Sequence, residues 1–437
     1  MTPSPTRKSR PIRRKRSADR SSLLIVHATE LVTLRGTPGP RRGEAASELA
    51  LIEDGAVYAE GERIVDVGTT SEVLVRHPRA EVRIDASGNL VLPGFVDAHT
   101  HAVFAGSRER EVEWKSQGLS YAQIAARGGG ILQTVRATRA ASEEELARTT
   151  ANRLESMLAF GTTSVEVKSG YGLRTVDEVK MLRAAGTAGN LSGLDVVPTF
   201  LGAHAIPPDF ATHKDRYVDI VAGEMLDAVA ANHAASFCDV FVDEGYFSAD
   251  QGRRILKKAR ARGLIPKVHA DQLAETGGAA LAAEVRAASA DHLIHPSADG
   301  IDAMARSGVV GVLLPAASLT SNLPFADGRR LLAAGVPLAL GTDFNPNCWC
   351  ESIQLAIALA CHHNGLLPAQ AIVAATVNAA HAIGRGSEIG TLEPGKVADI
   401  LLLQIPSYRH LGYRIGGNAV RAVVKRGRVR VGPSSVE

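Results

Sequence analysis

His99 and His101 end the apolar stretch LVLPGFVDA and are separated by a single residue. Side chains alternate along a strand, so both histidines face the same way and their imidazoles can reach one point. A neutral imidazole is a common ligand for Zn²⁺ or Fe²⁺. One such pair is a weak signal by itself, because histidines on a strand are also satisfied by hydrogen bonds.

Several later segments repeat this arrangement, in which an apolar stretch stops at a histidine or an aspartate. The residues are His204 in FLGAHA, His269 and Asp271 in KVHADQ, Asp291 and His292 in SADH, and Asp343 in LGTD. One further histidine and one carboxylate would turn the first pair into a site with room for water, as catalytic zinc sites have. The spacing alone leaves His204 and His269 as rival candidates for the third histidine.

Apolar strands that alternate with helical segments fill the middle of the chain. Eight such strands lie between residues 91 and 385, from VLPGFVDAHTH to VPLALGTD. Eight βα units predict an α/β fold, a closed parallel (β/α)8 TIM-like barrel whose carboxyl strand ends form the mouth of the site. An open doubly wound sheet is the alternative.

Both ends of the chain are rich in alternating, β-branched residues instead. Residues 21–90 and residues 386–437 each have the pattern of strands and turns. We expect the two parts to form one small β-sandwich-like domain beside the barrel of residues 91–385. Separate folding of the two parts is the alternative.

A basic tail precedes these strands. Residues 1–20 hold eight Lys and Arg residues and one Asp, so the remaining chain is mildly acidic although the net charge of the whole is +3. An acidic body gives no reason to expect a nucleic-acid partner. Pro, Ser and like charges resist folding, so we interpret the tail as a disordered extension or as the product of a start codon placed too far upstream. A nucleic-acid or targeting arm is the alternative.

The composition is that of a globular protein, with 437 residues of which 45% are hydrophobic and 22% charged. The sequence has no run of about 18 apolar residues, so it predicts no membrane span. The basic tail is not followed by the apolar region of a signal peptide. The four cysteines are Cys238, Cys348, Cys350 and Cys361. They do not make a disulfide framework in a chain of this length. We therefore expect a cytoplasmic protein without a membrane partner.

Longer motifs are more specific than the histidine pair. They are DAHTHAVFAGSRERE, RGGGILQT, GTTSVEVKSGYGL, FLGAHAIPPDF, KVHADQLAETGGAALAAE and GTDFNPN. With these motifs the chain resembles the imidazolonepropionase family of the amidohydrolase superfamily, from about Leu23 to the C-terminus. The resemblance implies a metal-dependent barrel with a flanking β domain, in a homodimer that binds one Zn²⁺ or Fe²⁺ per subunit. It also implies that the small-molecule substrate 4-imidazolone-5-propanoate is hydrolysed at its cyclic amide to N-formimidoyl-L-glutamate, in histidine degradation.

The resemblance also implies residue roles. The implied metal ligands are His99, His101, His269 and Asp343. The implied substrate contacts are Arg108, Tyr171, His204, Gln272, Asn345, Asn347 and Cys348. A guanidinium can grip the propionate carboxylate with two charge-assisted hydrogen bonds, and Arg108 lies on the loop that leaves the first metal-ligand strand. A surface arginine paired with Glu109 or Glu111 is the alternative.

Catalytic roles are expected for Asp343, His292 and Gln272. Asp343 could accept a proton from the attacking water, and His292 could move that proton or stabilise the oxyanion. Some family members carry Glu where this chain has Gln272, and Gln cannot act as a base. Proton transfer should therefore depend more on Asp343 and His292, with Gln272 orienting water or substrate.

Tyr171 lies between two glycines, and such a loop can bring a phenol close to a ligand; an exposed turn is the alternative.

After Asp343 the family usually has a small Gly-Thr-Ser segment, whereas this chain has NCWCES, in which Trp349 could narrow the pocket. The Cys348/Cys350 pair lacks a matching pair elsewhere, so a structural role is favoured over zinc binding.

Two other functions stay open. One is a related amidohydrolase, either a cyclic amidase or a deaminase, that acts on another small carboxylated heterocycle. The other is a barrel that has lost catalysis and binds a partner protein. The convergence of polar strand ends argues against the second function, because a binding module does not need it.

Overall fold

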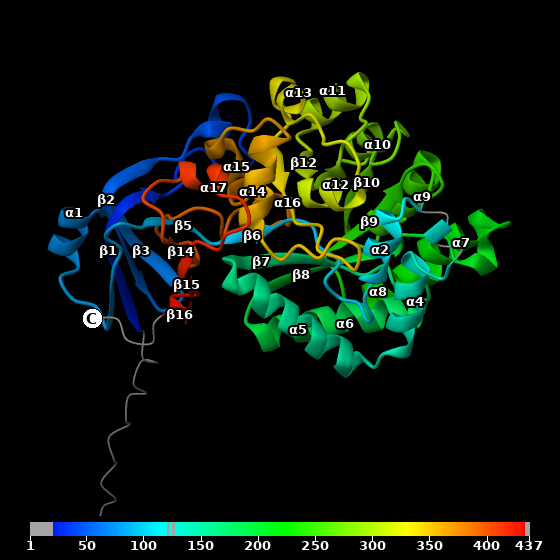
Figure 1. Ribbon diagram of the computed structural model, residues 1–437, viewed down its shortest axis with the longest axis horizontal. Coiled ribbons are helices and arrows are strands. Elements are labelled where there is room, and N and C mark those ends of the chain that lie inside the picture. Colours follow the sequence, from blue (N-terminus) through cyan, green and yellow to red (C-terminus); the bar gives the residue numbers. More distant parts are fainter. Residues whose placement is uncertain (1–20, 120–122, 125–126, 433–437) are drawn as a thin grey trace, which may run out of the picture.

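The computed structural model describes residues 21–119, 123–124 and 127–432. The basic tail of residues 1–20 lies outside the described residues, so its interpretation stays a prediction. Figure 1 shows two parts: a body in which helices surround strands, and a sheet at one end of the molecule that combines blue strands from the chain start with red strands from the chain end.

Eight parallel strands form the ring, and each one pairs with the next in sequence order. They are β6 (Phe95–Asp97), β7 (Thr162–Lys168), β8 (Asp195–Ala203), β9 (Phe237–Val242), β10 (Ile265–Ala270), β11 (Ser289–His292), β12 (Val310–Leu313) and β13 (Leu338–Leu340). Past the ends of β6 and β13, the Asp343 N–H donates to the His99 carbonyl at 3.0 Å and the His101 N–H donates to the Phe344 carbonyl at 2.8 Å. These bonds close the seam, so the predicted barrel is confirmed and the open sheet was the wrong alternative.

Helices cover the outside of the barrel (Figure 1). They are α2 (Arg110–Ser116), α4 (Ile131–Ala140), α5 (Glu143–Ala159), α6 (Thr175–Ser192), α7 (Lys214–Ile220), α8 (Leu226–Ala231), α9 (Ala249–Arg260), α10 (Gly278–Glu284), α11 (Ala298–Ser307), α12 (Pro315–Ser321), α13 (Gly328–Ala333), α14 (Ile353–His362), α15 (Pro368–Ala374) and α16 (Val377–Ala382). A π-helical turn, η3 (Val221–Met225), joins α7 to α8, and the short 3-10 turn η2 (Pro208–Phe210) precedes α7.

Helix α9 illustrates why these segments are helical. Ser248 accepts the N–H of Gln251 at 3.2 Å, and the Gln251 side chain accepts the N–H of Ser248 at 3.0 Å. This capping box satisfies two backbone donors at the helix start. Ile255, Leu256 and Ala259 recur at helical spacing and are buried against the barrel, so the apolar face fixes the orientation of the helix.

Strands from both chain ends form one mixed sheet, which we call the terminal sheet. Its strands are β1 (Ser22–Val32), β2 (Leu51–Glu60), β3 (Arg63–Thr69), β4 (Val82–Asp85), β5 (Leu90–Pro93), β14 (Ile400–Leu403), β15 (Val420–Lys425) and β16 (Arg428–Val431). The short helices η1 (Gly43–Ser47), α1 (Thr70–Arg76) and α17 (Arg409–Tyr413) lie in its connections. Because β14 pairs antiparallel with β5, the two chain ends form one unit, and the alternative of separate folding was wrong.

The terminal sheet curls around its own core. An isolated bridge joins Arg63 of β3 to Val397, the segment just before β14. Ile25, Val91 and Leu402 are completely buried inside the curl. The predicted division between residues 90 and 91 falls within β5, and the boundaries of the units otherwise stay predictions.

The terminal sheet continues into the barrel through one residue, Gly94, which lies between β5 and β6. A Cβ on Gly94 would come within 2.2 Å of the Thr163 side chain on β7, so this close approach requires glycine. Among the described residues, no helix has the length and apolar character needed to cross a membrane.

An ion-pair cluster fixes the terminal sheet to the barrel. Asp195, at the start of β8, lies 2.6 Å from Arg385, 2.8 Å from Lys425 and 2.8 Å from Arg426. Burial alone would raise the pKa of Asp195, but the charges and hydrogen bonds of Lys425, Arg385 and Arg426 outweigh it and hold the pKa well below its ordinary value. The carboxylate is therefore charged at neutral pH.

We expect the Asp195→Asn variant to lose about 3 kcal/mol of unfolding free energy at neutral pH, because three cations lose their shared carboxylate. A lowered folded-state pKa stabilises the protein above the unfolded-state value of about 4, and this stabilisation is lost as the pH falls below that value. Urea unfolding at several pH values should therefore show the gap between wild type and variant closing below about pH 4. Asp250→Asn removes an exposed ion pair and should change stability by less than about 0.5 kcal/mol.

Candidate metal centre

Four donor atoms converge at the carboxyl ends of the barrel strands. His101 Nε2 lies 3.2 Å from His99 Nε2 and 3.3 Å from His269 Nε2. Asp343 Oδ1 lies 3.6 Å from Nε2 of both His99 and His101. Two nitrogens bound tetrahedrally to Zn²⁺ at 2.0–2.1 Å are about 3.4 Å apart. Each of these distances is compatible with two donors that share a divalent ion, and all four side chains are buried.

Two carboxylates orient two of these histidines. Asp291 Oδ2 lies 2.6 Å from His99 Nδ1, and Asp239 Oδ2 lies 2.9 Å from His269 Nδ1. The His99 Nδ1–H donates to Asp291, which leaves its Nε2 lone pair directed at the cluster, as in metal-ligating histidines generally. His269 Nδ1 lies at ion-pair distance from Asp239 without the geometry of a hydrogen bond. Burial lowers the pKa of His99 and of His101 well below the ordinary value. Both rings are therefore neutral near pH 7, the form that binds metal.

His204, the rival for the third histidine position, is placed differently from His269. Its ring stacks on His101 with centroids 4.8 Å apart, and its Nδ1 contacts the Gly170 carbonyl at 3.1 Å. Among the described residues, ligand atoms that all lie within 4.8 Å of one another form the groups His99/His269/His292, His99/His101/Asp343 and His99/Glu166/Asp291, and none of these contains His204. The distances therefore favour His269 as a ligand and place His204 at the wall of the site.

His292 borders the cluster from the end of β11. Its ring centroid lies 5.5 Å from His99 and 5.3 Å from His269. Burial lowers the pKa of His292 well below its ordinary value. Several strand-end residues here have positive φ, namely Asp271, His292, Leu293 and Asp343. Such backbone strain clusters at functional sites, where the surrounding fold enforces it.

Asp343 begins a loop that holds its own side chain. The Asn345 side-chain amide donates to Asp343 Oδ1 at 3.0 Å. The Oδ1 atom of Asn345 in turn accepts the N–H groups of Asn347 and Cys348. Burial raises the pKa of Asp343 to about 6. The Asn347 side chain faces Lys115, whose Nζ donates to it at 2.6 Å.

The segment NCWCES, which stands where the family usually has a small Gly-Thr-Ser stretch, contributes mainly packing contacts. Cys348 is buried in an apolar cluster with Cys350, Ala316 and Leu359. Burial raises the pKa of the Cys348 thiol well above its ordinary value. Trp349 is half exposed and packs edge-on against Phe104 and Phe344. Trp349 therefore covers residues next to Asp343 from the outside.

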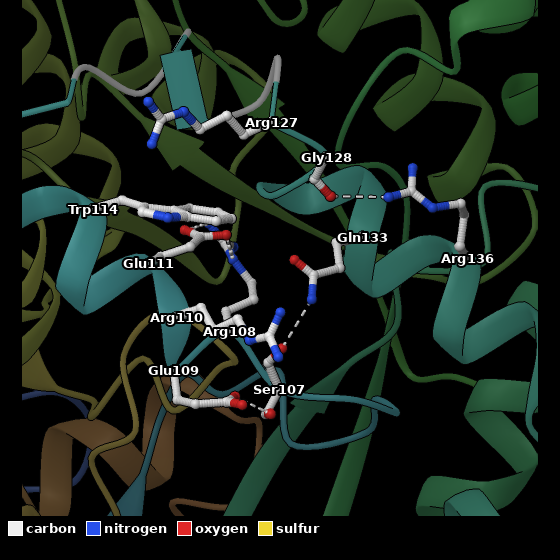
Figure 2. A pocket seen from close by; sticks show the side chains of 10 residues that line it. All are labelled: Ser107, Arg108, Glu109, Arg110, Glu111, Trp114, Arg127, Gly128, Gln133 and Arg136. Atoms are coloured by element: carbon white, nitrogen blue, oxygen red, sulfur yellow. Dashed lines mark hydrogen bonds and ion pairs between the residues drawn. The ribbon is translucent and has the colours of Figure 1, made fainter.

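Arg108 is buried, so it is not a surface arginine. Its Nε and Nη2 donate to the two carboxylate oxygens of Glu111 at 2.7 Å each, and Glu109 pairs with Ser107 instead. Figure 2 shows this pair at one wall of a pocket of about 530 Å³. Three further arginines line the pocket, namely Arg110, Arg127 and Arg136. This lining favours an anionic ligand.

Tyr171 is also buried, so the exposed turn was the wrong alternative for it. Its ring lies 5.9 Å from His101 and 5.2 Å from His204. The sequence interpretation missed Glu178 of α6, a buried carboxylate that accepts the N–H groups of Gly170, Gly172 and Leu173 at 2.7–2.9 Å. Glu178 therefore fixes the loop that carries Tyr171.

Gln272 lies on a loop that is held in a similar way. Asp243 accepts the N–H groups of Gln272 and Leu273 at 2.7 and 2.8 Å. Asp271, which the strand-end pattern suggested for the site, instead accepts the N–H groups of Gly278 and Ala279 at the start of α10. Its carboxylate therefore holds a helix start and does not reach the four converging donor atoms.

Sequence interpretation also missed a group of fully buried charges inside the barrel. These residues are Glu166, Lys168, Asp239 and Lys267, which join Asp291. The signal was available in the alternation of the strands: in KVHADQ, Lys267 has the same parity as His269 and so must also face the interior. Charged residues on an interior face of an apolar strand are rare unless they are paired.

Comparisons with known proteins agree with this fold and site. A model of the amidohydrolase family matches residues 90–430. A crystal structure of an adenosine deaminase from Xanthomonas campestris with bound zinc superposes with a TM-score of 0.69, at 19% identity over 94% of this chain and 93% of that one. The ochratoxinase of A. niger also gives 0.69, at 19% identity over 95% and 97%. These two likenesses show the fold, and the matched family defines the class, an amidohydrolase.

Sequence relatives are more specific. An imidazolonepropionase of Symbiobacterium thermophilum is 50% identical over 95% of this chain and 98% of its own length. Imidazolonepropionases of Geobacillus kaustophilus and Haloarcula marismortui are each 46% identical, over 95% and 93% of this chain and 99% and 95% of their own lengths. The chain belongs to the imidazolonepropionase family. Its amidohydrolase class and the His/Asp cluster together point to a divalent metal.

Proposed function

We propose that this protein hydrolyses the cyclic amide of 4-imidazolone-5-propanoate to N-formimidoyl-L-glutamate, a step of histidine degradation. The observation that carries the proposal is the convergence of four buried donor atoms in a chain 50% identical, over nearly its whole length, to an imidazolonepropionase. The arginine-lined pocket agrees with a substrate that carries a carboxylate.

The proposed ligands of one Zn²⁺ or Fe²⁺ ion are His99, His101, His269 and Asp343. When bound, the ion would polarise the ring carbonyl and supply a water nucleophile that is active near neutral pH. Three imidazoles and one carboxylate around a divalent ion would leave a net positive site, which suits the negative charge that develops on the carbonyl oxygen.

Proton transfer is assigned to Asp343 and His292. Asp343 Oδ1 is one of the four converging donor atoms, so its carboxylate would lie beside the attacking water and could accept its proton. His292 is proposed to move the proton to the ring nitrogen or to stabilise the oxyanion. Gln272 has no basic form, so it is proposed to orient water or substrate by hydrogen bonds.

Substrate binding is assigned to the residues around this centre. Arg108 would bind the propionate through its guanidinium, while Tyr171, His204 and Asn345 would contact the ring. Asn347 and Cys348 are proposed to support substrate binding by holding Asn345, whose Oδ1 accepts both of their N–H groups. The Asn347 side chain itself faces Lys115, and the Cys348 thiol packs in an apolar cluster.

A direct assay tests the proposal. The purified protein should consume 4-imidazolone-5-propanoate, followed by loss of the ring chromophore, and a chelator should stop the reaction until Zn²⁺ or Fe²⁺ is restored. Turnover that is insensitive to chelator, in protein without near-stoichiometric metal, would refute the metallohydrolase assignment. Activity confined to another carboxylated heterocycle in a substrate panel would favour a different cyclic amidase or a deaminase.

The homodimer and the cytoplasmic setting are part of this proposal and derive from the family resemblance. Light scattering on the full-length chain tests the first. A monomer at micromolar concentration would contradict it.

Arg108 provides a test of substrate class. We expect Arg108→Met to raise KM for 4-imidazolone-5-propanoate about 10- to 100-fold, because one charge-assisted, two-point contact is worth about 1.5–3 kcal/mol. Arg136→Met is the matched control, since Arg136 lines the same pocket but donates to the Gly128 carbonyl. The double variant Arg108→Met/Glu111→Gln removes the buried charge that the first change leaves behind. Unchanged KM in both Arg108 variants would contradict the assignment.

A further inference from the structure

Five charged side chains lie inside the barrel beneath the converging donor atoms, and none of them is exposed to solvent. We call them the barrel ion cluster: Glu166, Lys168, Asp239, Lys267 and Asp291. Lys168 Nζ lies 2.8 Å from Glu166, 2.8 Å from Asp239 and 3.4 Å from Asp291, and Lys267 Nζ lies 2.8 Å from Glu166. The four strands β7, β9, β10 and β11 thus meet through charges.

Lys168 shares its acceptor atoms with two histidines. Asp239 Oδ2 contacts both Lys168 Nζ, at 2.8 Å, and His269 Nδ1, at 2.9 Å. Asp291 Oδ2 contacts both Lys168 Nζ, at 3.4 Å, and His99 Nδ1, at 2.6 Å. Within the part of the chain that the structure describes, no other lysine or arginine forms an ion pair with either carboxylate.

We propose that Lys168 is a positioning residue whose ammonium holds Asp239 and Asp291 so that His269 and His99 direct their Nε2 atoms to one point. The inference rests on the proposed metal site and deepens it. The contacts run from one cation through two carboxylates to two of the four proposed ligands. Lys168 touches none of the four ligand atoms itself.

The complete burial of these charges is poorly explained by a packing role alone. Removing two or more charges from water costs several kcal/mol per ion, and apolar residues of similar volume often give equal or greater stability. Lys168 is also held by its backbone, since its N–H donates to the carbonyl of Thr100, the residue between His99 and His101, at 2.9 Å. The side chain and the main chain of Lys168 therefore act on the same pair of ligands.

The charges of the cluster give the expected direction of change. With Lys168 present, three carboxylates face two lysines. Without it, the ion pair that remains in the cluster joins Lys267 to Glu166, and Asp239 and Asp291 would repel each other inside the barrel without a lysine in contact with either. Each would turn away, and the imidazole that it orients would follow.

The test is metal affinity, which a purely structural role would not change. Full-length Lys168→Met protein is freed of metal by chelator dialysis and titrated with Zn²⁺ against a chromophoric chelator. We expect Kd for Zn²⁺ to rise about 10- to 100-fold, the usual effect of losing a partner that orients a ligand. The absorption spectrum of the Co²⁺ form should change as well, because the ligand geometry changes.

Lys425→Met is the matched control. Lys425 is a buried lysine that also contacts two carboxylates, Asp195 at 2.8 Å and Asp399 at 2.6 Å, but it lies in the terminal sheet. It should lose stability and keep the wild-type Kd for Zn²⁺. Wild-type Kd and Co²⁺ spectrum in a folded Lys168→Met protein would overturn the inference.

Failure of the variant to fold and failure of the proposed metal site are distinguishable outcomes. If Lys168→Met does not fold, Lys168→Arg keeps the charge with different donor geometry; it should weaken Zn²⁺ binding, and a wild-type Kd there would also overturn the inference. If the wild-type protein itself binds no stoichiometric Zn²⁺ or Fe²⁺, the proposed metal site fails, and the inference fails with it. Normal binding by wild type and by Lys168→Met would reject the role of Lys168 alone.

Discussion

The His101→Ala variant is expected to lose at least about 10³-fold in turnover of 4-imidazolone-5-propanoate while it keeps its fold. The loss follows from the position of His101, whose Nε2 lies within 3.3 Å of both His99 Nε2 and His269 Nε2. Without His101 the proposed ion loses the ligand that lies between His99 and His269. The ion's Lewis-acid stabilisation of the transition state, which is worth several kcal/mol, would then be lost or weakened. Kinetics and metal content, measured on the same sample, check the prediction.

The fold should survive this change because His101 contributes to the barrel seam through its backbone. Its N–H donates to the Phe344 carbonyl, and alanine retains that bond. His363→Ala is the matched control, since that ring stacks on Phe325 with centroids 4.3 Å apart and belongs to no proposed ligand group. A His101→Ala protein with wild-type turnover and full metal content would refute the ligand assignment.

The second large effect is expected for Asp343→Asn, which should lower kcat about 10²- to 10⁴-fold, the range of general acid–base catalysis. Asn is the suitable replacement because Asp343 has a φ of +50°, a conformation that Asn tolerates. The amide can still donate or accept hydrogen bonds but cannot take up a proton at neutral pH.

Metal content separates the two roles assigned to Asp343. A variant that keeps its Zn²⁺ but turns over slowly has lost the base, whereas one that loses Zn²⁺ has lost a ligand. Full turnover in Asp343→Asn would exclude both roles and leave proton transfer to His292.

The barrel could be predicted from sequence because its information is local. Each strand is a short apolar run that ends in a polar residue, and His99, His269 and Asp343 lie at such ends. Two side chains at positions i and i+2 of a strand must share a face. This rule places His99 and His101 together without any knowledge of the other strands.

Other features depend on contacts between distant segments and could not be predicted in this way. The choice of His269 over His204 depends on the relative rotation of β8 and β10. The alternation rule would have directed Lys168 inward, but not toward Asp239 and Asp291 on other strands. For Arg108, the sequence offered Glu109 and Glu111 as partners but could not choose between them or show that the pair with Glu111 is buried.

The seam between β6 and β13 has a consequence for the order of events during synthesis. His99 and Asp343 are hydrogen-bonded neighbours in the finished barrel, yet they are about 240 residues apart in the chain. A ribosome needs roughly 10–50 s to make that length. A nascent chain therefore exposes the His99/His101 pair long before its partners exist, and the first and last strands of the barrel must meet before the complete ligand set can capture its ion. Loading of the proposed ion would thus be confined to chains whose barrel has been translated to the end.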